Sequence, residues 1–552
     1  MRWLMLAVIA AILALAAAPA LGPIAFEEMA GRAGIHFVAD NSPTPNKNLP
    51  ETMLGGVALL DYDNDGYLDV YFVNGAAIPS LQKDSPKYWN RLYHNNRNGT
   101  FTDVTEQAGV KGEGYGIGVA VGDYDNDGWP DIFVANVTKN QLFHNNHNGT
   151  FTEVTDRAGV GGAKLDGKKM WAVSAGWFDY DNDGLLDLMV SNYCVWEVNK
   201  DPFCGPNPNV RAYCHPKNYA PLPNTLYHNN GDGTFTDVSG PTGIGAIRGK
   251  GMGVAFADYD HDGFTDVFVA NDNAPNMLFH NLGGKKFEEV GLRTGVAYPD
   301  SGAYMSGMGA DFRDIDNDGW DDLWVTGFEG DTFPLFRNRG GGDFLEITGA
   351  AGIAGVTRTM SGWANGIYDF DNDGWKDLLV ARGHVVDNIA VMTGREPQEP
   401  NTVLRNLGNR KFQDVSAGAG TGFETPLAHR GVAFGDLDND GRVDAVSSVL
   451  QGNAQYFHNI SHNENHWILL KLEGVKSNRM GLGAQVRITT DGGAQYNHAT
   501  TSTGYACSSD PRVHFGLGSA KVVKEIDIVW PSGIHQTLRD VAADQILTVK
   551  ER

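Results

Sequence analysis

Several signatures of common protein classes are missing from this chain of 552 residues. It has only four cysteines, and its 43 Lys and Arg residues against 67 Asp and Glu give a formal net charge of −24. This shortage of basic residues argues against a nucleic-acid partner. No metalloprotease H-E-x-x-H, serine-hydrolase G-x-S-x-G or phosphate-binding G-x-x-x-x-G-K-[ST] motif occurs. The sequence therefore offers no motif for nucleic-acid binding or for these enzyme classes.

Residues 1–20 are predicted to be a signal peptide. Arg2 precedes a long apolar run that ends in Ala18-Pro19-Ala20, a pattern typical of cleavage after Ala20. An uncleaved anchor is the alternative, because the run is nearly long enough to span a bilayer. No later segment has that length, and no Cys follows the leader for lipid attachment. We expect a secreted, periplasmic or cell-surface protein whose mature chain has no transmembrane domain.

Aspartate is abundant in one pattern, D-x-D-x-D-G-x-x-D, which occurs seven times. Four carboxylates within nine residues repel one another unless a cation lies among them, and Ca²⁺ accepts six to eight oxygen ligands in irregular geometry. By analogy with other Ca²⁺ loops, positions one, three and five offer side-chain oxygens and position seven a backbone carbonyl. Position nine is expected to close the shell in bidentate fashion, and Gly at position six permits the tight turn.

The sequence therefore predicts up to seven structural Ca²⁺ ions. Their ligands are Asp61, Asp63, Asp65 and Asp69; Asp123, Asp125, Asp127 and Asp131; Asp179, Asp181, Asp183 and Asp187; Asp258, Asp260, Asp262 and Asp266; Asp314, Asp316, Asp318 and Asp322; Asp369, Asp371, Asp373 and Asp377; and Asp436, Asp438, Asp440 and Asp444. An EF-hand is excluded, because none of the seven loops has Glu at position twelve and short β-branched and aromatic runs follow them.

The first six acidic loops are each followed by a hairpin signature such as Leu92-Tyr-His-Asn-Asn-Arg-Asn-Gly-Thr-Phe-Thr-Asp-Val-Thr105. Four strands repeated seven times predict an all-β fold, a seven-bladed β-propeller over residues 24–460. The seventh unit lacks its last strand, and residues 26–35 match the missing piece. We therefore expect an N-terminal strand to close the last blade. Residues 461–552 are predicted to form a small β-domain.

The acidic repeats resemble the FG-GAP repeats of integrin α-subunit propellers and their bacterial relatives. Three later motifs look like the ASPIC/UnbV domain that follows such propellers in the cartilage acidic protein family: Ser477-Asn-Arg-Met-Gly-Leu-Gly-Ala484, Ser508-Ser-Asp-Pro-Arg-Val-His-Phe-Gly-Leu-Gly518 and Trp530-Pro-Ser-Gly533. The resemblance implies an extracellular Ca²⁺-binding interaction architecture.

The even number of cysteines suggests disulfides in an exported protein. We expect Cys204 to pair with Cys214 within the long insertion at residues 191–224. Cys194 could reach Cys507 if the C-terminal domain packed over this insertion. A metal site formed by Cys204, Cys214 and His215 is the alternative.

The face opposite the acidic loops is the expected recognition face, since three long connections, residues 74–90, 191–224 and 381–402, lie there. Its candidate ligand-binding residues are Asn192, Asp272, His384, Trp171, Trp363 and Arg430. The repeated His-Asn pairs are expected to make hydrogen bonds between blades rather than to bind metal. We expect His261, at a variable position of its loop, to be solvated.

Two functions follow from this pattern. The first is a non-catalytic Ca²⁺-stabilised module that recognises extracellular or periplasmic proteins or glycans. The alternative is an enzyme of the same scaffold, a carbohydrate lyase or dehydratase with its site in the channel opposite the Ca²⁺ loops. A plugged channel favours the module, and a cluster of ionisable groups with shifted pKa values there favours the enzyme.

Overall fold

The structure, a computed structural model, describes residues 23–552, so the predicted signal peptide lies outside the described residues. Strands joined by turns and very short helices make up the described chain. The prediction of an all-β, propeller-type fold is confirmed. Over residues 23–552 we find no helix with the length and apolar character needed to cross a membrane.

Seven antiparallel sheets form the propeller, and we number these blades in chain order from the first acidic loop. Blades 1 to 3 are β2–β5 (Val57–Leu60, Asp69–Phe72, Arg91–Asn95, Phe101–Asp103), β6–β9 (Gly116–Gly122, Asp131–Asn136, Gln141–Asn145, Phe151–Glu153) and β12, β13, β17 and β18 (Ala172–Phe178, Asp187–Asn192, Thr225–Asn229, Phe235–Asp237).

Blades 4 to 6 have the same order of strands. They are β20–β23 (Gly251–Ala257, Asp266–Asn271, Met277–Asn281, Phe287–Glu289), β24–β27 (Ala310–Arg313, Asp322–Val325, Leu335–Asn338, Phe344–Glu346) and β28–β31 (Gly362–Tyr368, Asp377–Arg382, Thr402–Asn406, Phe412–Asp414). The first two strands of the blades are buried on both faces, which explains their continuous apolar runs.

Blade 7 joins the two ends of the propeller chain. It contains β32–β34 (His429–Gly435, Asp444–Val449, Gln455–Asn459) and, as its outermost strand, β1 (Phe26–Glu28). Phe26 pairs with Asn459 in an antiparallel register and is almost fully buried. The first strand of each blade contacts that of the next, and β32 contacts β2, so the circuit is closed.

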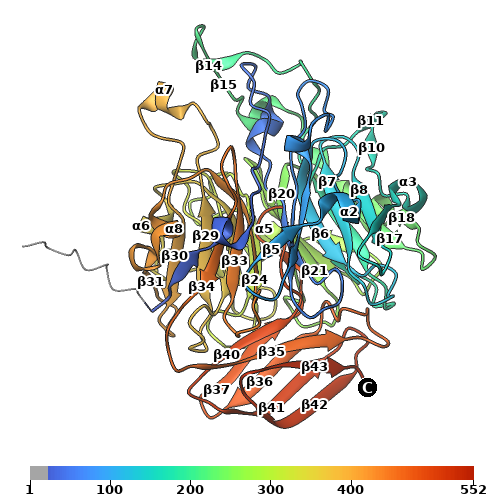
Figure 1. Ribbon diagram of the computed structural model, residues 1–552, viewed down its shortest axis with the longest axis vertical. Coiled ribbons are helices and arrows are strands. Elements are labelled where there is room, and N and C mark those ends of the chain that lie inside the picture. Colours follow the sequence, from blue (N-terminus) through green and yellow to red (C-terminus); the bar gives the residue numbers. More distant parts are fainter. Residues whose placement is uncertain (1–22) are drawn as a thin grey trace, which may run out of the picture.

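The C-terminal module consists of two packed sheets, β40-β35-β43 and β37-β36-β41-β42. Its strands are β35–β37 (His466–Glu473, Gln485–Thr490, Gly493–His498) and β40–β43 (Val513–Gly518, Val522–Val529, His535–Ala542, Gln545–Lys550). Apolar residues that alternate along these strands, such as Ile526 and Ile528, fill the space between the sheets. Figure 1 shows this module as a layer against one face of the propeller.

Shorter elements lie at the rims of the blades. They are α1 (Ala30–Ala33), α2 (Thr105–Ala108), α3 (Thr155–Ala158), α4 (Ser239–Thr242), α5 (Gly291–Thr294), α6 (Ala354–Thr357), α7 (Ile389–Thr393), α8 (Thr421–Glu424), β10 (Lys164–Leu165), β11 (Lys168–Lys169), β14 (Cys204–Asn207), β15 (Val210–Ala212), β16 (Leu222–Pro223) and β19 (Arg248–Gly249). The β14–β15 hairpin and α7 project from the face away from the C-terminal module (Figure 1).

The predicted disulfide is present: Cys204 and Cys214 are bonded, with their Cα atoms 5.2 Å apart. The suggested bridge between Cys194 and Cys507 is absent, and both are buried free thiols. Cys507 does not lie beside Cys194, because its Sγ packs inside the propeller, 3.9 Å from Gly55 O and against Gly431 of β32.

Candidate metal centres

The acidic turn between the first and second strands has the same hydrogen bonds in all seven blades, and loop 2 (residues 123–131) illustrates them. Asp123, at position one, accepts the backbone N–H of Asp127 at 3.0 Å and that of Gly128 at 2.8 Å. Asp127, at position five, accepts the N–H of Trp129 at 2.9 Å. Gly128 has a φ of +90°, a conformation that favours glycine. Two of the four carboxylates therefore also shape the turn.

The aspartate at position nine is a buried anchor for backbone donors. Asp131 is 1% exposed, and its Oδ2 and Oδ1 accept the N–H groups of Tyr124 at 3.3 Å and Asn145 at 2.8 Å. All seven residues at this position are at most 1% exposed. Oδ1 therefore holds the loop to the third strand and Oδ2 holds position two of the loop itself, and each oxygen keeps a second lone pair with which it could also bind a cation.

Position three is where the turn leaves oxygens without donors. In five loops its Oδ1 atom is buried and accepts no hydrogen bond; these residues are Asp63, Asp181, Asp260, Asp316 and Asp371. A buried carboxylate oxygen without a donor is costly. A hard divalent cation would satisfy it, and other ligand atoms are close: those of Asp63, Asp69 and His94 lie within 4.8 Å of one another. The residues present therefore fit Ca²⁺.

Burial raises the pKa values of these carboxyl groups. The pKa is raised to about 7 for Asp123, Asp131 and Asp258 and to about 8 for Asp179, because burial removes water from the charged form. Neighbouring carboxylates of the same turn raise these pKa values further. The ionised turn therefore needs a source of positive charge.

The repeated histidine turns toward the acidic loop of its own blade. In five blades its Nδ1 atom lies 3.2 or 3.3 Å from Oδ1 of the aspartate at position nine. His94 Nδ1 is also 3.4 Å from Asp63 Oδ2. The expectation that this histidine makes hydrogen bonds between blades was wrong. Blades 5 and 6 have Arg337 and Arg405 at the same place.

The asparagine that follows the histidine makes the bond between blades instead. Asn145 Nδ2 donates to the carbonyl of Tyr62 in the preceding blade at 2.8 Å. The equivalent asparagine does so in all seven blades, including Asn95, which donates to Leu437 O of blade 7. The hydrogen bond predicted for the His-Asn pair therefore belongs to its second member.

Position four of the loops forms a second set of links, which sequence reasoning missed. Asn64 Nδ2 donates to Gly128 O of the next loop at 2.9 Å, and five other loops repeat this bond. The exception is His261, which stacks on Trp320 with ring centroids 4.0 Å apart. His261 is exposed as expected, but it is not free of contacts. Asparagine in six of seven copies was the signal for this link.

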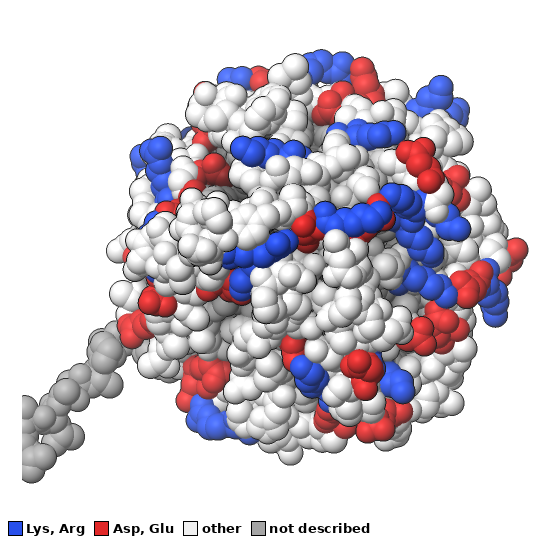
Figure 2. Space-filling view, turned by 90° about the horizontal axis from the view of Figure 1, so that it is seen from above, with Lys and Arg blue, Asp and Glu red and all other residues white. Residues whose placement is uncertain are grey.

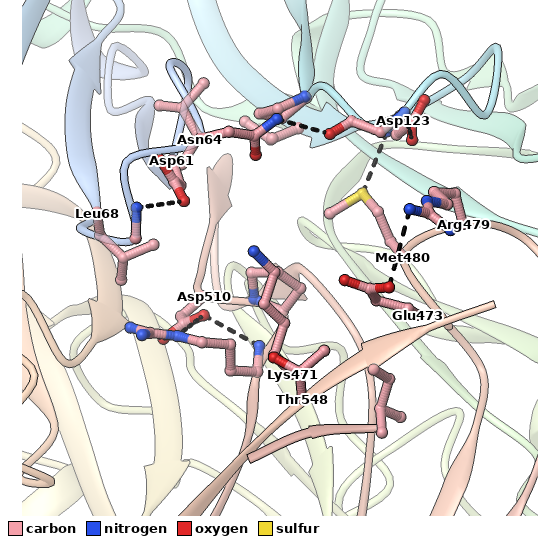
Figure 3. Close-up of a pocket in the computed structure, with 18 of the residues that line it drawn as sticks. Asp61, Asn64, Leu68, Asp123, Lys471, Glu473, Arg479, Met480, Asp510 and Thr548 are labelled. Carbon is pink, nitrogen blue, oxygen red and sulfur yellow. Dashed lines mark hydrogen bonds and ion pairs between the residues drawn. The ribbon is translucent and has the colours of Figure 1, made fainter. Parts of the chain in front are cut away.

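The C-terminal module contributes charged groups beside two of the turns. A cleft of about 470 Å³ separates loops 1 and 2 from β35 and β43 of the module. Asp61 and Asp123 line one side of the cleft, and Lys471 and Arg479 line the other (Figure 3). Arg479 N–H also donates to Asn126 Oδ1 at 2.8 Å, which ties the module to loop 2.

The channel between the first strands is filled by a segment of the C-terminal module that we call the inserted loop (residues 499–512), which contains β38 (Ser502–Thr503) and β39 (Cys507–Ser508). Residues 499–510 are all buried. Ala506 O accepts the N–H of Val119 at 3.1 Å, and Gly504 N–H donates to Ala310 O at 2.9 Å. Further contacts reach the first strand of every other blade. The channel is therefore plugged.

The six residues predicted to bind a ligand are buried. Exposure is 1–2% for Trp171, Trp363 and Arg430 and 3–8% for Asn192, His384 and Asp272. The Arg430 guanidinium lies 4.1 Å from the ring centre of Trp363, which in turn contacts Tyr505 of the inserted loop at 5.1 Å between centroids. Asn192 donates to Pro223 O at 2.9 Å. In this structure these side chains pack within the propeller.

Comparisons with known proteins agree with this architecture. A model of the FG-GAP-like repeat matches residues 61–134, 123–190, 218–269, 258–325, 314–380 and 385–447, and a model named ASPIC and UnbV matches residues 474–552. The chain belongs to the FG-GAP-like repeat family.

This FG-GAP-like chain is similar along most of its length to cartilage acidic protein 1. The Mus musculus protein is 24% identical over 91% of this chain and 74% of its own length, and the Xenopus tropicalis protein is 26% identical over 91% and 73%. Among solved structures, YCF48 from Cyanidioschyzon merolae matches with a TM-score of 0.40 and 8% identity, covering 79% of this chain and 99% of that one.

Proposed function

We propose that this chain is an exported, Ca²⁺-binding β-propeller that acts as a recognition module for extracellular or periplasmic proteins or glycans. The observation that carries the proposal is the buried, donorless Oδ1 atom at position three, which recurs in five acidic turns. Because the same buried oxygen lacks a donor at equivalent positions, one kind of ligand, a divalent cation, is favoured at all of them.

The metal in this proposal is structural. Positions one, three and five and the carbonyl of position seven are the groups that would hold Ca²⁺, and the bound ion would neutralise the turn. Each turn joins two buried strands, so the free energy of binding adds to the free energy of folding. No part of a reaction is assigned to these residues.

The face away from the C-terminal module is the proposed recognition face. Its connections differ in length from blade to blade, as expected for a surface adapted to a partner. A cavity of about 390 Å³ lies there, lined by Trp196, Leu165, Lys168 and neighbouring residues. Figure 2 shows Lys and Arg side chains in a band across this face, although the chain as a whole is acidic.

The filled channel supports a binding module rather than the enzyme alternative. A lyase or dehydratase in the channel would need ionisable side chains that a sugar can reach. The inserted loop occupies that space. Burial lowers the pKa of Arg430 to about 10 and that of His429 to about 4, but both side chains are closed off from solvent and from a sugar. The Cys204–Cys214 bond and the similarity to cartilage acidic protein 1 support export, because such disulfides persist in oxidising compartments.

Thermal unfolding of the purified protein with and without EGTA tests the calcium part of the proposal. We expect the chelator to lower Tm by several degrees or more, and excess Ca²⁺ to restore it while Mg²⁺ does not. An unchanged melting curve in excess EGTA would contradict the proposal that bound Ca²⁺ stabilises the fold. Screening the calcium-loaded protein against glycan arrays and surface proteins would then test the recognition role.

A further inference from the structure

In loops 5 and 6 (residues 314–322 and 369–377), an arginine side chain of the same blade brings a positive charge to the acidic turn. Arg405 of β30 places Nε 2.7 Å from Asp371 Oδ2 and Nη2 2.7 Å from Asp373 Oδ2. Arg337 of β26 makes the same pair of contacts with Asp316, at 2.8 Å, and Asp318. One guanidinium therefore joins positions three and five of each loop. We call this contact the arginine fork.

No equivalent contact is found in the other loops among residues 23–552. Loops 3 and 4 (residues 179–187 and 258–266) have an imidazole as their only ion-pair partner, from His228 and His280. In loops 1 and 7 an arginine reaches the aspartate at position five alone. An arginine stays charged at all relevant pH values, and its planar fork matches two carboxylate oxygens. A histidine offers neither property.

A buried lysine gives loops 5 and 6 a second support. Lys376, at position eight of loop 6, donates through Nζ to Asp314 O of loop 5 at 2.9 Å and to Tyr496 O of the C-terminal module at 2.8 Å. Position eight has no charge in the first four loops, where Leu68, Pro130, Leu186 and Thr265 occupy it. The two loops with a fork are therefore also joined to each other and to the module.

The arginine fork does not use the oxygens that fit a metal. It contacts the Oδ2 atoms of Asp316 and Asp371, while their Oδ1 atoms are buried without a donor. Loop 5 has a fifth carboxylate, Asp321, which lies 3.1 Å from Nδ1 of His498, and loop 6 has the positive charge of Lys376. In each loop the guanidinium adds one positive charge beside the four carboxylates of the motif. This weakens the attraction for a divalent cation and also lowers the repulsion that remains when the cation is absent.

We propose that loops 5 and 6 keep their closed conformation without a divalent cation and bind Ca²⁺ more weakly, whereas loops 3 and 4 depend on Ca²⁺ to stay closed. The inference rests on the proposed calcium binding and divides it among the sites. The blades that hold the C-terminal module through Lys376 would then remain ordered when calcium falls.

Hydrogen exchange of the full chain, measured by mass spectrometry with Ca²⁺ or EGTA, tests this division. In EGTA we expect exchange in residues 179–187 and 258–266 to rise by about tenfold or more, and exchange in residues 314–322 and 369–377 to change by less than about twofold. The double variant Arg337→Gln, Arg405→Gln should make loops 5 and 6 sensitive to the chelator. Arg358→Gln is the matched control, because Arg358 is exposed and is not in an ion pair among the described residues.

A gain-of-function variant decides the question if the double variant does not fold. His228→Arg should supply loop 3 with a fork and reduce its exchange in EGTA about tenfold relative to the unaltered chain. Equal chelator sensitivity of loops 3, 4, 5 and 6, or no protection by His228→Arg, would overturn the inference while leaving calcium binding intact. If no loop responds to EGTA, the proposed calcium binding itself fails.

Discussion

The two faces of the propeller are built in different ways. On the face with the acidic turns, the same hydrogen bonds recur within the turn of every blade. Asparagine side chains there donate to backbone carbonyls of the neighbouring blade. On the other face, residues far apart in the chain meet once: Tyr213 OH lies 3.1 Å from Glu51 Oε2 and 3.1 Å from Asp387 Oδ2. We therefore expect the face with the acidic turns to gain its stability from many similar small contributions, and the rest of the molecule from a few single contacts.

This difference also separates two kinds of function. A repeated turn can bind many copies of one ion, because each copy meets the same oxygens. Recognition of a particular partner requires a surface that does not repeat, and the face with the long connections is one such surface. The comparison predicts that substitutions at single contacts cost more than substitutions in the repeated links.

The largest effect is expected at Tyr505, where the inserted loop joins the two faces. Its side chain is fully buried, packs against Trp363 and donates its hydroxyl to Met53 O at 2.6 Å. Tyr505→Ala should lower the free energy of unfolding by about 3–5 kcal/mol, as measured by chemical denaturation, because truncating a buried aromatic leaves a cavity.

Tyr505→Phe is the control, since it removes the hydroxyl but keeps the ring. It should cost about 1–2 kcal/mol, the loss expected when one buried hydrogen bond is broken. The picture of the inserted loop as a central support would be contradicted if Tyr505→Ala cost no more than Tyr505→Phe.

Sequence alone was sufficient for the order of strands and turns on the repeated face, although not for the partners of the histidine and of position four. The seven acidic motifs and the hairpins after them fix the order of strands, because each blade depends on hydrogen bonds between neighbouring segments. Asp123, Gly128 and their equivalents lie in the turns where the motif places them. The asparagine links could also have been found from their recurrence.

Sequence was not sufficient where contacts are long-range. Nothing in the Ser- and Thr-rich run around Tyr505 shows that it enters a channel formed by strands from Val57 to Gly435. Trp363 and Arg430 were expected on an open funnel, because strand starts near a channel are exposed unless something fills it. The inserted loop fills it, so these residues became part of the core.

A smaller effect with a clear pH dependence is expected at Glu399, on the face with the long connections. Burial raises its pKa to about 7, and its Oε2 accepts the N–H of Ser361 at 3.0 Å. Unfolding returns this pKa to its ordinary value near 4.5, so the folded chain holds a proton that the unfolded chain has lost between these pH values. The native state therefore loses stability as pH rises from about 4.5 to 7.

Glu399→Gln keeps the shape of the side chain and removes this titration. At pH 8 in excess Ca²⁺ the variant should be more stable than the unaltered chain by about 2–3 kcal/mol, and at pH 4.5 the two should differ by less than about 1 kcal/mol. Urea unfolding at both pH values measures the difference. A variant that is less stable at pH 8 would show that the carboxylate is satisfied in its charged form.

The smallest effect is expected in the repeated links. Asn182 Nδ2 donates to Gly263 O at 2.9 Å, and Asn182 has a φ of +57°, so glycine is the substitution that removes the amide without backbone strain. Asn182→Gly should cost about 0.5–1 kcal/mol in calcium-loaded protein, since the bond is exposed. Asn64→Gly, which removes the bond from loop 1 to loop 2, should cost a similar amount.

The double variant Asn64→Gly, Asn182→Gly tests whether the links between loops contribute independently to the free energy of unfolding. The two bonds join different pairs of loops and share no partner, so their costs should add to within about 0.5 kcal/mol. A double variant that loses much more than the sum would show that the links act as one closed ring. In that case the repeated face would be as cooperative as the single contacts around Tyr505, and the distinction between the two faces would fail.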